Sequence, residues 1–482
     1  MTGTITIVGL GPAGLDRIDQ RVGGLLDDPR WKLIVRTLRH PAARELGQRR
    51  QLESCDDLYQ ASDTFDEVYQ RIAHRVLAAA ADGDVVYAVP GSALVGERSV
   101  GLIRELAAEA GIGVDLVRGE SFLEVAIERL GLDPLEKGIQ VLDGRELPYP
   151  LLLHLPTLIA QVDTPLVLLD VKDALGRVLG PGTPVTVLAD LGGSDERVET
   201  KPLADLEGDD AGLRVVLFLD PPAVGWPGLV RTNRRLRHDC PWDSRQTHHS
   251  LVKHLVEEAY EAVEALSRLP EDAPGGEPDY PAYAEVEEEL GDLLLQVVFH
   301  ATLAAEVGAF DVEEVAEGIR RKLVRRHPHV FGEVEVEGAD QVIANWERLK
   351  HEEKERASRM DDVPAALPAL TRAAKVQGRA ATVGFDWPDL EGVLADVGEE
   401  LQELKDVLDD PDAAASELGD VLFAVVNAAR RLDVDPELAL RRAVDRFDRR
   451  FRTMEAEGGL EGLTLEEMDR RWEAAKAGET DA

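Results

Sequence analysis

The chain has 482 residues and a formal net charge of −39, from 93 acidic and 54 basic residues. This charge disfavours polymeric nucleic acid and anionic membranes as partners, because both attract basic proteins. The two cysteines are too few for a disulfide framework or a zinc cage, no apolar run is long enough to span a membrane, and Gly and Pro stand where a signal peptide needs apolar residues. We therefore expect a cytoplasmic protein.

The first predicted element is a strand that runs into a glycine-rich turn, in TITIVGLGPAGLD. Gly9, Gly11 and Gly14 spell GxGxxG, but a dinucleotide fold also needs an acid at the end of the next strand. That strand, WKLIVRT, ends in Arg36 and Thr37. An arginine would suit a 2′-phosphate, whereas the glycines alone often only shape a turn. The pattern favours the structural interpretation.

Residues up to about 225 alternate short β-rich runs with helical patterns, which predicts an α/β domain. A Pro- and Gly-rich linker at 219–228 follows, and from residue 229 nearly everything is helix-forming, with a second break at 360–370. The clearest strands are expected at 84–91, 164–171, 183–190 and 213–220, and a helix at 122–132.

The helical part contains an internal sequence repeat of two copies. Four blocks of the first copy, at 255–266, 287–301, 320–331 and 345–350, recur in the same order at 397–408, 415–429, 444–451 and 471–476. Four matching blocks in one order indicate an internal duplication.

Each copy contains EExxE followed by ExxD, and helical spacing gathers each set of acids on one face. A solvated acidic face is the alternative in so acidic a chain. The ExxD motif, however, lies in an apolar context, so we expect a buried helix whose acids need a partner or a metal. Oxygen ligands select hard ions, so we predict Mg²⁺, with Mn²⁺ as a substitute. The acids are Glu257, Glu258, Glu261, Glu289, Asp292, Glu399, Glu400, Glu403, Glu417 and Asp420.

Basic residues recur in register around both acid sets, which favours a phosphate clamp over scattered surface salt bridges. A Trp/Lys pair four residues apart also occurs in each copy; it would place an indole and an ammonium beside one ligand, or anchor a core. These candidates are Arg231, Arg235, Lys322, Arg325, Arg326, Trp346 and Lys350, with Lys375, Arg379, Arg446, Arg449, Arg450, Trp472 and Lys476.

The sequence thus offers acids that could bind a metal, Lys and Arg side chains that could bind phosphates, and an aromatic side chain that could stack on a nucleobase. Together they describe a nucleotide pyrophosphohydrolase. In such an enzyme a metal-activated water attacks phosphorus, and a carboxylate outside the metal shell removes the proton. A di-iron bundle would need ExxH on two helices, which neither acid block contains. A non-catalytic bundle that serves dimerisation is the remaining alternative, and the acids within apolar blocks argue against it.

At these blocks the chain resembles the MazG family of nucleoside triphosphate pyrophosphohydrolases, whose members often carry two all-α repeats. The first repeat is carried by CPWDSRQTHHSLVKHLVEEAYEAVEAL and RRHPHVFG, the second by VGFDW and ELGDVLFAVVNAARRL. The resemblance implies cleavage of NTP or dNTP to NMP and pyrophosphate with Mg²⁺, and it favours a homodimer. It makes Glu257 and Glu399 the candidate bases or auxiliary ligands and the other eight acids metal ligands, and Lys375, Arg379, Trp472 and Lys476 match positions that engage the nucleotide.

The first half is similar to the tetrapyrrole methylase family, a two-lobed α/β fold that binds S-adenosylmethionine. The resemblance implies a cofactor site at Gly9, Gly11, Pro90 and Gly91. The family's PGDP appears here as PGSA, at 90–93, which makes S-adenosylmethionine doubtful and favours a regulatory or vestigial domain. Methyl transfer by this domain is the alternative function. The predicted domains are the methylase-like 1–225 and the MazG repeats 229–360 and 361–478.

Overall fold

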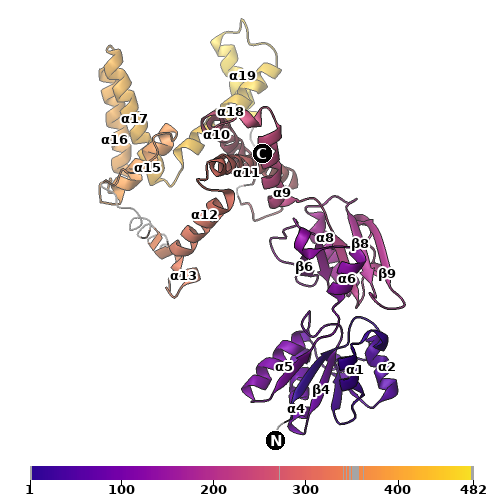
Figure 1. The fold of residues 1–482 in the computed structure, drawn as a ribbon. Helices are drawn as coiled ribbons and strands as arrows, with labels where there is room; N and C mark the ends of the chain where they lie inside the picture. The colour runs from indigo at the N-terminus through magenta and orange to yellow at the C-terminus, as the bar shows by residue number, and fades with distance from the viewer. Residues whose placement is uncertain are drawn as a thin grey trace. The chain divides into compact units, whose positions relative to one another are not determined.

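The computed structural model describes residues 3–270, 272–339, 341–342, 345–346, 349, 358–361 and 363–478. Contacts within the chain divide it into two compact units, Met1–Ala316 and Glu317–Ala482. The α/β elements lie in the first unit and helices dominate the second (Figure 1). The predicted fold class, an α/β domain followed by an all-α region, is confirmed. In the part of the chain that the structure describes, every helix is too short or too polar to cross a membrane.

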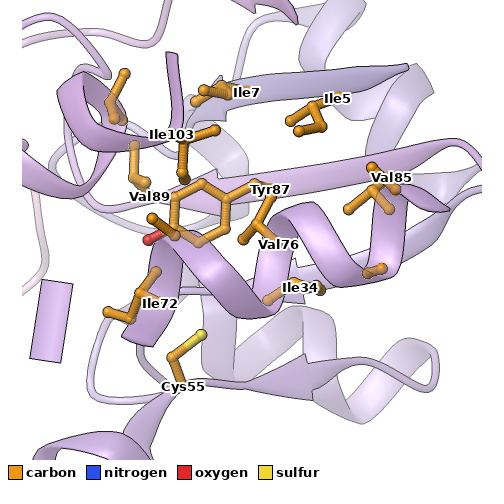
Figure 2. Packing of buried hydrophobic residues seen from close by; sticks show 14 of the residues in the cluster. Ile5, Ile7, Ile34, Cys55, Ile72, Val76, Val85, Tyr87, Val89 and Ile103 are labelled. Carbon is orange, nitrogen blue, oxygen red and sulfur yellow. The ribbon is translucent and has the colours of Figure 1, made fainter. Parts of the chain in front are cut away.

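The N-terminal lobe contains a parallel five-stranded sheet in the order β3-β2-β4-β1-β5. Helices cover both of its faces, so its central strands are buried and read as continuous apolar runs. Figure 2 shows one core, where Tyr87 lies among Ile72, Val76 and Ile103 and its hydroxyl is 3.0 Å from Ser99 Oγ. The elements are β1 (Ile5–Gly9), η1 (Leu15–Arg17), α1 (Gln20–Asp27), β2 (Lys32–Val35), α2 (Pro41–Arg49), β3 (Glu53–Ser54), α3 (Asp56–Gln60), α4 (Phe65–Ala81), β4 (Val85–Val89), α5 (Arg98–Glu109) and β5 (Val114–Val117).

The glycine-rich turn packs backbone against backbone at the carboxyl ends of three strands. The Gly11 N–H donates to the Gly91 carbonyl at 3.0 Å, and the Gly91 N–H donates back to Gly11 at 2.8 Å. Both residues have positive φ, +67° and +63°. A Cβ on Gly9 would lie 2.5 Å from the Gly91 carbonyl oxygen and 2.8 Å from the Gly119 nitrogen. The glycines therefore allow these strand ends to meet.

Gly9→Ala should destabilise the N-terminal lobe by about 3 kcal/mol, because the new methyl group meets backbone atoms that cannot rotate away. Gly101→Ala in α5 is the matched control: it has open space and should stabilise the chain by about 0.5 to 1 kcal/mol. Urea unfolding followed by circular dichroism measures both. Equal midpoints for the two variants would contradict the close packing at Gly9.

The second lobe contains a mixed sheet in the order β6-β7-β10-β8-β9, with α6 on one face and α8 on the other. The strand expected at 164–171 is wrong, because these residues begin α8. Thr164 caps that helix by accepting the Val167 N–H, and Pro165 occupies its first position. These two start signals outweigh the β-like apolar run. The elements are α6 (Phe122–Leu130), α7 (Pro134–Lys137), β6 (Gln140–Asp143), β7 (Thr157–Ala160), α8 (Pro165–Gly176), β8 (Pro184–Ala189), β9 (Arg197–Pro202), η2 (Leu203–Asp205), η3 (Gly208–Asp210) and β10 (Val215–Leu219).

The remaining elements in the described residues are helical. The first unit also holds α9 (Gly225–Asp239), η4 (Asp243–Arg245), α10 (His248–Ser267) and α11 (Tyr280–Glu306), and α12 (Val312–Arg326) crosses the boundary between the units. The second unit holds α13 (Pro328–Phe331), α15 (Ala369–Ala381), α16 (Leu390–Asp406), α17 (Pro411–Arg431), α18 (Pro436–Ala456) and α19 (Leu465–Gly478).

Candidate active site

Two helices of the first unit bring three acids together. Thr247 caps α10 by accepting the Ser250 N–H, and this helix packs against α11. Glu258 lies on α10, and Glu289 and Asp292 lie on α11. One carboxylate oxygen from each lies within 4.8 Å of the others. We call these three residues the first acid cluster.

The second unit repeats this arrangement. The short segment 407–410 joins α16 to α17, and the two helices lie side by side (Figure 1). Glu400 on α16 comes within the same 4.8 Å limit of Glu417 and Asp420 on α17. We call these the second acid cluster. Helical spacing alone could not show that the acids of two separate helices converge.

The expectation that these acids are buried is wrong for the chain as described. Asp292 and Asp420 are exposed, and Glu289 and Glu417 are partly exposed. Their apolar neighbours are exposed as well: Leu294 is 40% exposed, and Leu418, Leu422 and Phe423 are 49%, 51% and 46% exposed. The apolar context of ExxD therefore marks uncovered helix faces rather than a core within one chain.

Desolvation and, after it, repulsion between neighbouring carboxylates raise the pKa of acids in both clusters. The pKa of Glu258 is raised mainly by desolvation and next by the charge of Asp292. Desolvation and then Glu261 raise the pKa of Glu289. In the second cluster, desolvation and the charges of Glu403 and Asp420 raise the pKa of Glu400. A divalent cation would relieve this repulsion, and an all-oxygen donor set fits a hard ion.

Glu400→Gln should raise the melting temperature of the metal-free protein at pH 8. A carboxyl whose pKa is raised on folding binds more protons when folded, so its contribution to stability falls as pH rises above its unfolded value. Below about pH 3 the carboxyl is protonated in both states, because this lies more than one unit under its unfolded pKa of about 4.3, and wild type and variant should melt alike. Scanning calorimetry in EDTA at both pH values checks this. A lower melting temperature for the variant at pH 8 would refute the repulsion, and Glu461→Gln, in an exposed loop, is the control.

The other predicted acids lie beside the clusters. Glu261 and Glu403 do not enter the 4.8 Å groups, but they act electrostatically on Glu258 and Glu400. Glu257 is exposed, and its Oε2 lies 3.3 Å from His254 Nδ1. Glu399 is exposed on α16.

The two tryptophans make the same contact in both repeats. The Arg326 guanidinium carbon lies 5.2 Å from the centre of the Trp346 ring, and that of Arg450 lies 5.6 Å from the centre of the Trp472 ring. Sequence comparison predicted these residues to be equivalent, but not this contact. Each indole therefore has a cationic neighbour on one face.

The other predicted basic residues are mostly exposed on their helices. Arg379 is partly buried and donates to the Arg359 carbonyl at 2.8 Å. Arg235 pairs with Asp239 at 3.3 Å, and Lys476 lies 3.7 Å from Glu473. Lys350 lies outside the described residues. Those exposed are Arg231, Lys322, Arg325, Lys375, Arg446 and Arg449. The predicted residues from 322 to 346 belong to the second unit. The first acid cluster belongs to the first unit.

A histidine pair that the sequence did not indicate links α10 to α11. His248 Nδ1 and His300 Nδ1 are 2.9 Å apart, with ring centres 5.1 Å apart and planes within 15°. The nitrogens lie close to the line between the ring centres, which is the geometry of one imidazole donating to the other. The 52-residue separation gave no local signal for this contact.

The predicted S-adenosylmethionine positions form a closed turn. The amides of Gly11 and Gly91 donate to each other, so these two donors are committed within the protein. Gly9 lies against both neighbouring strand ends. The amides of Gly11 and Gly91 are therefore not available to hold a cofactor.

The architecture is thus an α/β domain followed by a duplicated helical module with one acid cluster in each copy. Residues 4–207 match the model of the tetrapyrrole (corrin/porphyrin) methylases, and residues 246–331 match the MazG nucleotide pyrophosphohydrolase domain. The chain is 36% identical to the uncharacterized protein YabN of Bacillus subtilis over 99% of both chains. It is 42% identical to the nucleoside triphosphate pyrophosphohydrolase of Escherichia coli over 52% of this chain and 97% of that protein. The corresponding protein of Thermotoga maritima is 44% identical, over 52% of this chain and 95% of its own.

The chain belongs to the MazG family of nucleotide pyrophosphohydrolases and carries an N-terminal tetrapyrrole methylase domain.

Proposed function

We propose that the protein hydrolyses nucleoside triphosphates between the α and β phosphates, releasing NMP and pyrophosphate. The observation that carries this proposal is the three-acid cluster, which occurs once in each helical repeat. The names of the Escherichia coli and Thermotoga maritima relatives support the substrate class. We also propose the domain limits 1–225, 229–360 and 361–478, with both repeats MazG-like.

We propose that both acid clusters hold Mg²⁺, with Glu261 and Glu403 as additional ligands. When bound, Mg²⁺ would neutralise triphosphate charge and stabilise the charge that develops at the leaving group. Lys375 and Arg379 would hold phosphates, and Trp472 would stack on the base with Arg450 on one face. In the first repeat, Arg231 and Arg235 would hold phosphates in the same way.

The attacking water needs a base outside the metal shell. Glu257 and Glu399 are exposed neighbours of the clusters, and their carboxylate oxygens would accept the proton. His254 approaches Glu257 at 3.3 Å and would orient it, whereas the second repeat has Asp396 at the equivalent position. We therefore expect the two repeats to differ in pH dependence.

We further propose that the chain works as a homodimer in the cytoplasm. The exposed apolar residues of α11 and α17 support an interface, because an isolated helical hairpin leaves such faces uncovered.

Product analysis tests the activity. The full chain is incubated with Mg²⁺ and each of the common NTPs and dNTPs, and the products are separated by anion-exchange chromatography. NMP and pyrophosphate in equal amounts are expected, and an EDTA control should give neither. Release of NDP and phosphate, or no product with any substrate, would overturn the proposed cleavage.

A further inference from the structure

Helices α10 and α11 are joined by a hydrogen bond between two histidines. His248 Nδ1 and His300 Nδ1 are 2.9 Å apart, so one imidazole must donate and the other accept. His248 is exposed at the first position of α10, whereas His300 is partly buried on α11. The contact therefore joins an imidazole that solvent reaches to one that is partly withdrawn from it.

The second nitrogen of His300 decides which imidazole donates. His300 Nε2 is buried, and in the described part of the chain it has no hydrogen-bond partner. A proton on this nitrogen would be a buried donor without an acceptor, which costs stability. We therefore assign the proton of neutral His300 to Nδ1, from which it is donated to His248 Nδ1. His248 then carries its own proton on Nε2.

This neutral pair cannot take up a further proton without loss. A proton on His248 Nδ1 would set two N–H donors against each other. Every other arrangement places a proton on His300 Nε2, where it has no acceptor. Burial and then the charge of His248 lower the pKa of His300, which agrees with a neutral imidazole at pH 7. Acid therefore weakens the contact by either route.

Other titratable residues lie on the elements next to the pair. Arg237 of α9 is engaged by Glu306 of α11 at 2.6 Å and by two carbonyls of the segment before α10. One turn to either side of His300, Gln296 and Ala304 are uncharged. The remaining titratable residues beside the pair on η4 and α10 are Asp243, Arg245, His249 and Lys253. Glu306 is thus committed to Arg237 rather than to a protonated imidazole.

The second repeat has no histidine at the equivalent positions. Counted from the repeated EExxE and ExxD motifs, Leu390 stands in place of His248 and Ala428 in place of His300. Leu390 begins α16 and Ala428 lies on α17, the two helices that carry the second acid cluster. The chain therefore contains the same helix pair once with a titrating contact and once without it.

We propose that the contact between His248 and His300 makes the α10–α11 pair of the first repeat sensitive to acid, whereas the α16–α17 pair of the second repeat is not. The first acid cluster takes Glu258 from one helix and Glu289 and Asp292 from the other, so weaker packing of the helices would separate its members. The contact acts without metal or nucleotide, so the proposal does not depend on the proposed hydrolysis.

Hydrogen exchange of the full chain in EDTA tests the proposal, measured by mass spectrometry on peptides of the four helices at pH 7.5 and pH 5.5. The rates are corrected for the intrinsic effect of pH on exchange, and the peptides of α16 and α17 report what protonation of an acid cluster does alone. His248→Asn is the test variant, because an amide can replace Nδ1 in the hydrogen bond but does not titrate. A second variant, His248→Leu with His300→Ala, carries the residues of the second repeat. His249→Asn, at the exposed neighbour, is the matched control.

In wild type and the control, the protection of α10 and α11 relative to α16 and α17 should fall about three- to tenfold at pH 5.5. About tenfold is the limit for one histidine that stays neutral when folded, because pH 5.5 is one unit below its ordinary pKa of about 6.5. Both test variants should change by less than about twofold. If His248→Asn is already unprotected at pH 7.5, the double variant decides. A loss in the test variants equal to that in wild type, or no loss in wild type, would overturn the proposal.

Discussion

Replacement of Glu261 and Glu403 together by glutamine should lower the rate of nucleotide hydrolysis at least about 100-fold. Each residue acts on its acid cluster, and each substitution removes a charge that the proposed Mg²⁺ requires without changing side-chain length. The loss corresponds to about 3 kcal/mol of transition-state stabilisation, which is a typical contribution for a metal site. Initial rates of pyrophosphate release at saturating Mg²⁺ measure it.

The single variants identify the working repeat. A full loss in Glu403→Gln with normal activity in Glu261→Gln would mean that the second repeat carries catalysis, and the converse would assign it to the first. Partial loss in each would mean two working sites. Wild-type activity in the double variant would refute the role of these acids, and Glu461→Gln serves as the charge-matched control.

The second large effect concerns the apolar face of α17. Replacing both Leu422 and Phe423 by aspartate should weaken dimerisation at least about 100-fold. Each side chain is about half exposed in the single chain. In a symmetric dimer both copies of each would be buried, and complete burial of one such side chain contributes about 1.5 to 3 kcal/mol of binding free energy. Sedimentation equilibrium measures the dissociation constant.

The control for this variant is Leu135→Asp in the methylase domain, where an apolar residue is 97% exposed and lies outside the helical repeats. It should leave association unchanged. If the Leu422 and Phe423 variant associates as wild type does, α17 is not the interface. A monomeric wild type would contradict the dimer itself.

The sequence predicted the elements whose local signals agree. Alternating β-rich and helical runs located the α/β domain, and the repeated blocks located the acid-bearing helices. Residues 164–171 were misread because a β-like apolar run overlapped two helix-start signals, Thr164 and Pro165. The start signals are local hydrogen-bonding and φ preferences, so they decide the outcome when the apolar run suits both structures.

Features that join distant segments were not predictable in this way. The burial expected for Asp292 and Asp420 was inferred from apolar neighbours, which are themselves exposed in one chain. The Gly11 and Gly91 bridge and the His248 and His300 pair depend on tertiary packing across many residues. A pattern of residue types does not show which distant residues come into contact.

Each helical repeat is proposed to hold a divalent cation in its acid cluster, and titration with Mn²⁺ tests this proposal. Electron paramagnetic resonance measures free Mn²⁺ during titration of the full chain, its Glu258→Gln and Glu400→Gln variants, and the double variant. The wild type should bind at least two Mn²⁺ per chain with measurable affinity, each single variant should lose one, and the double variant both. An unchanged number of bound ions in the double variant would show that the acid clusters do not hold the cations.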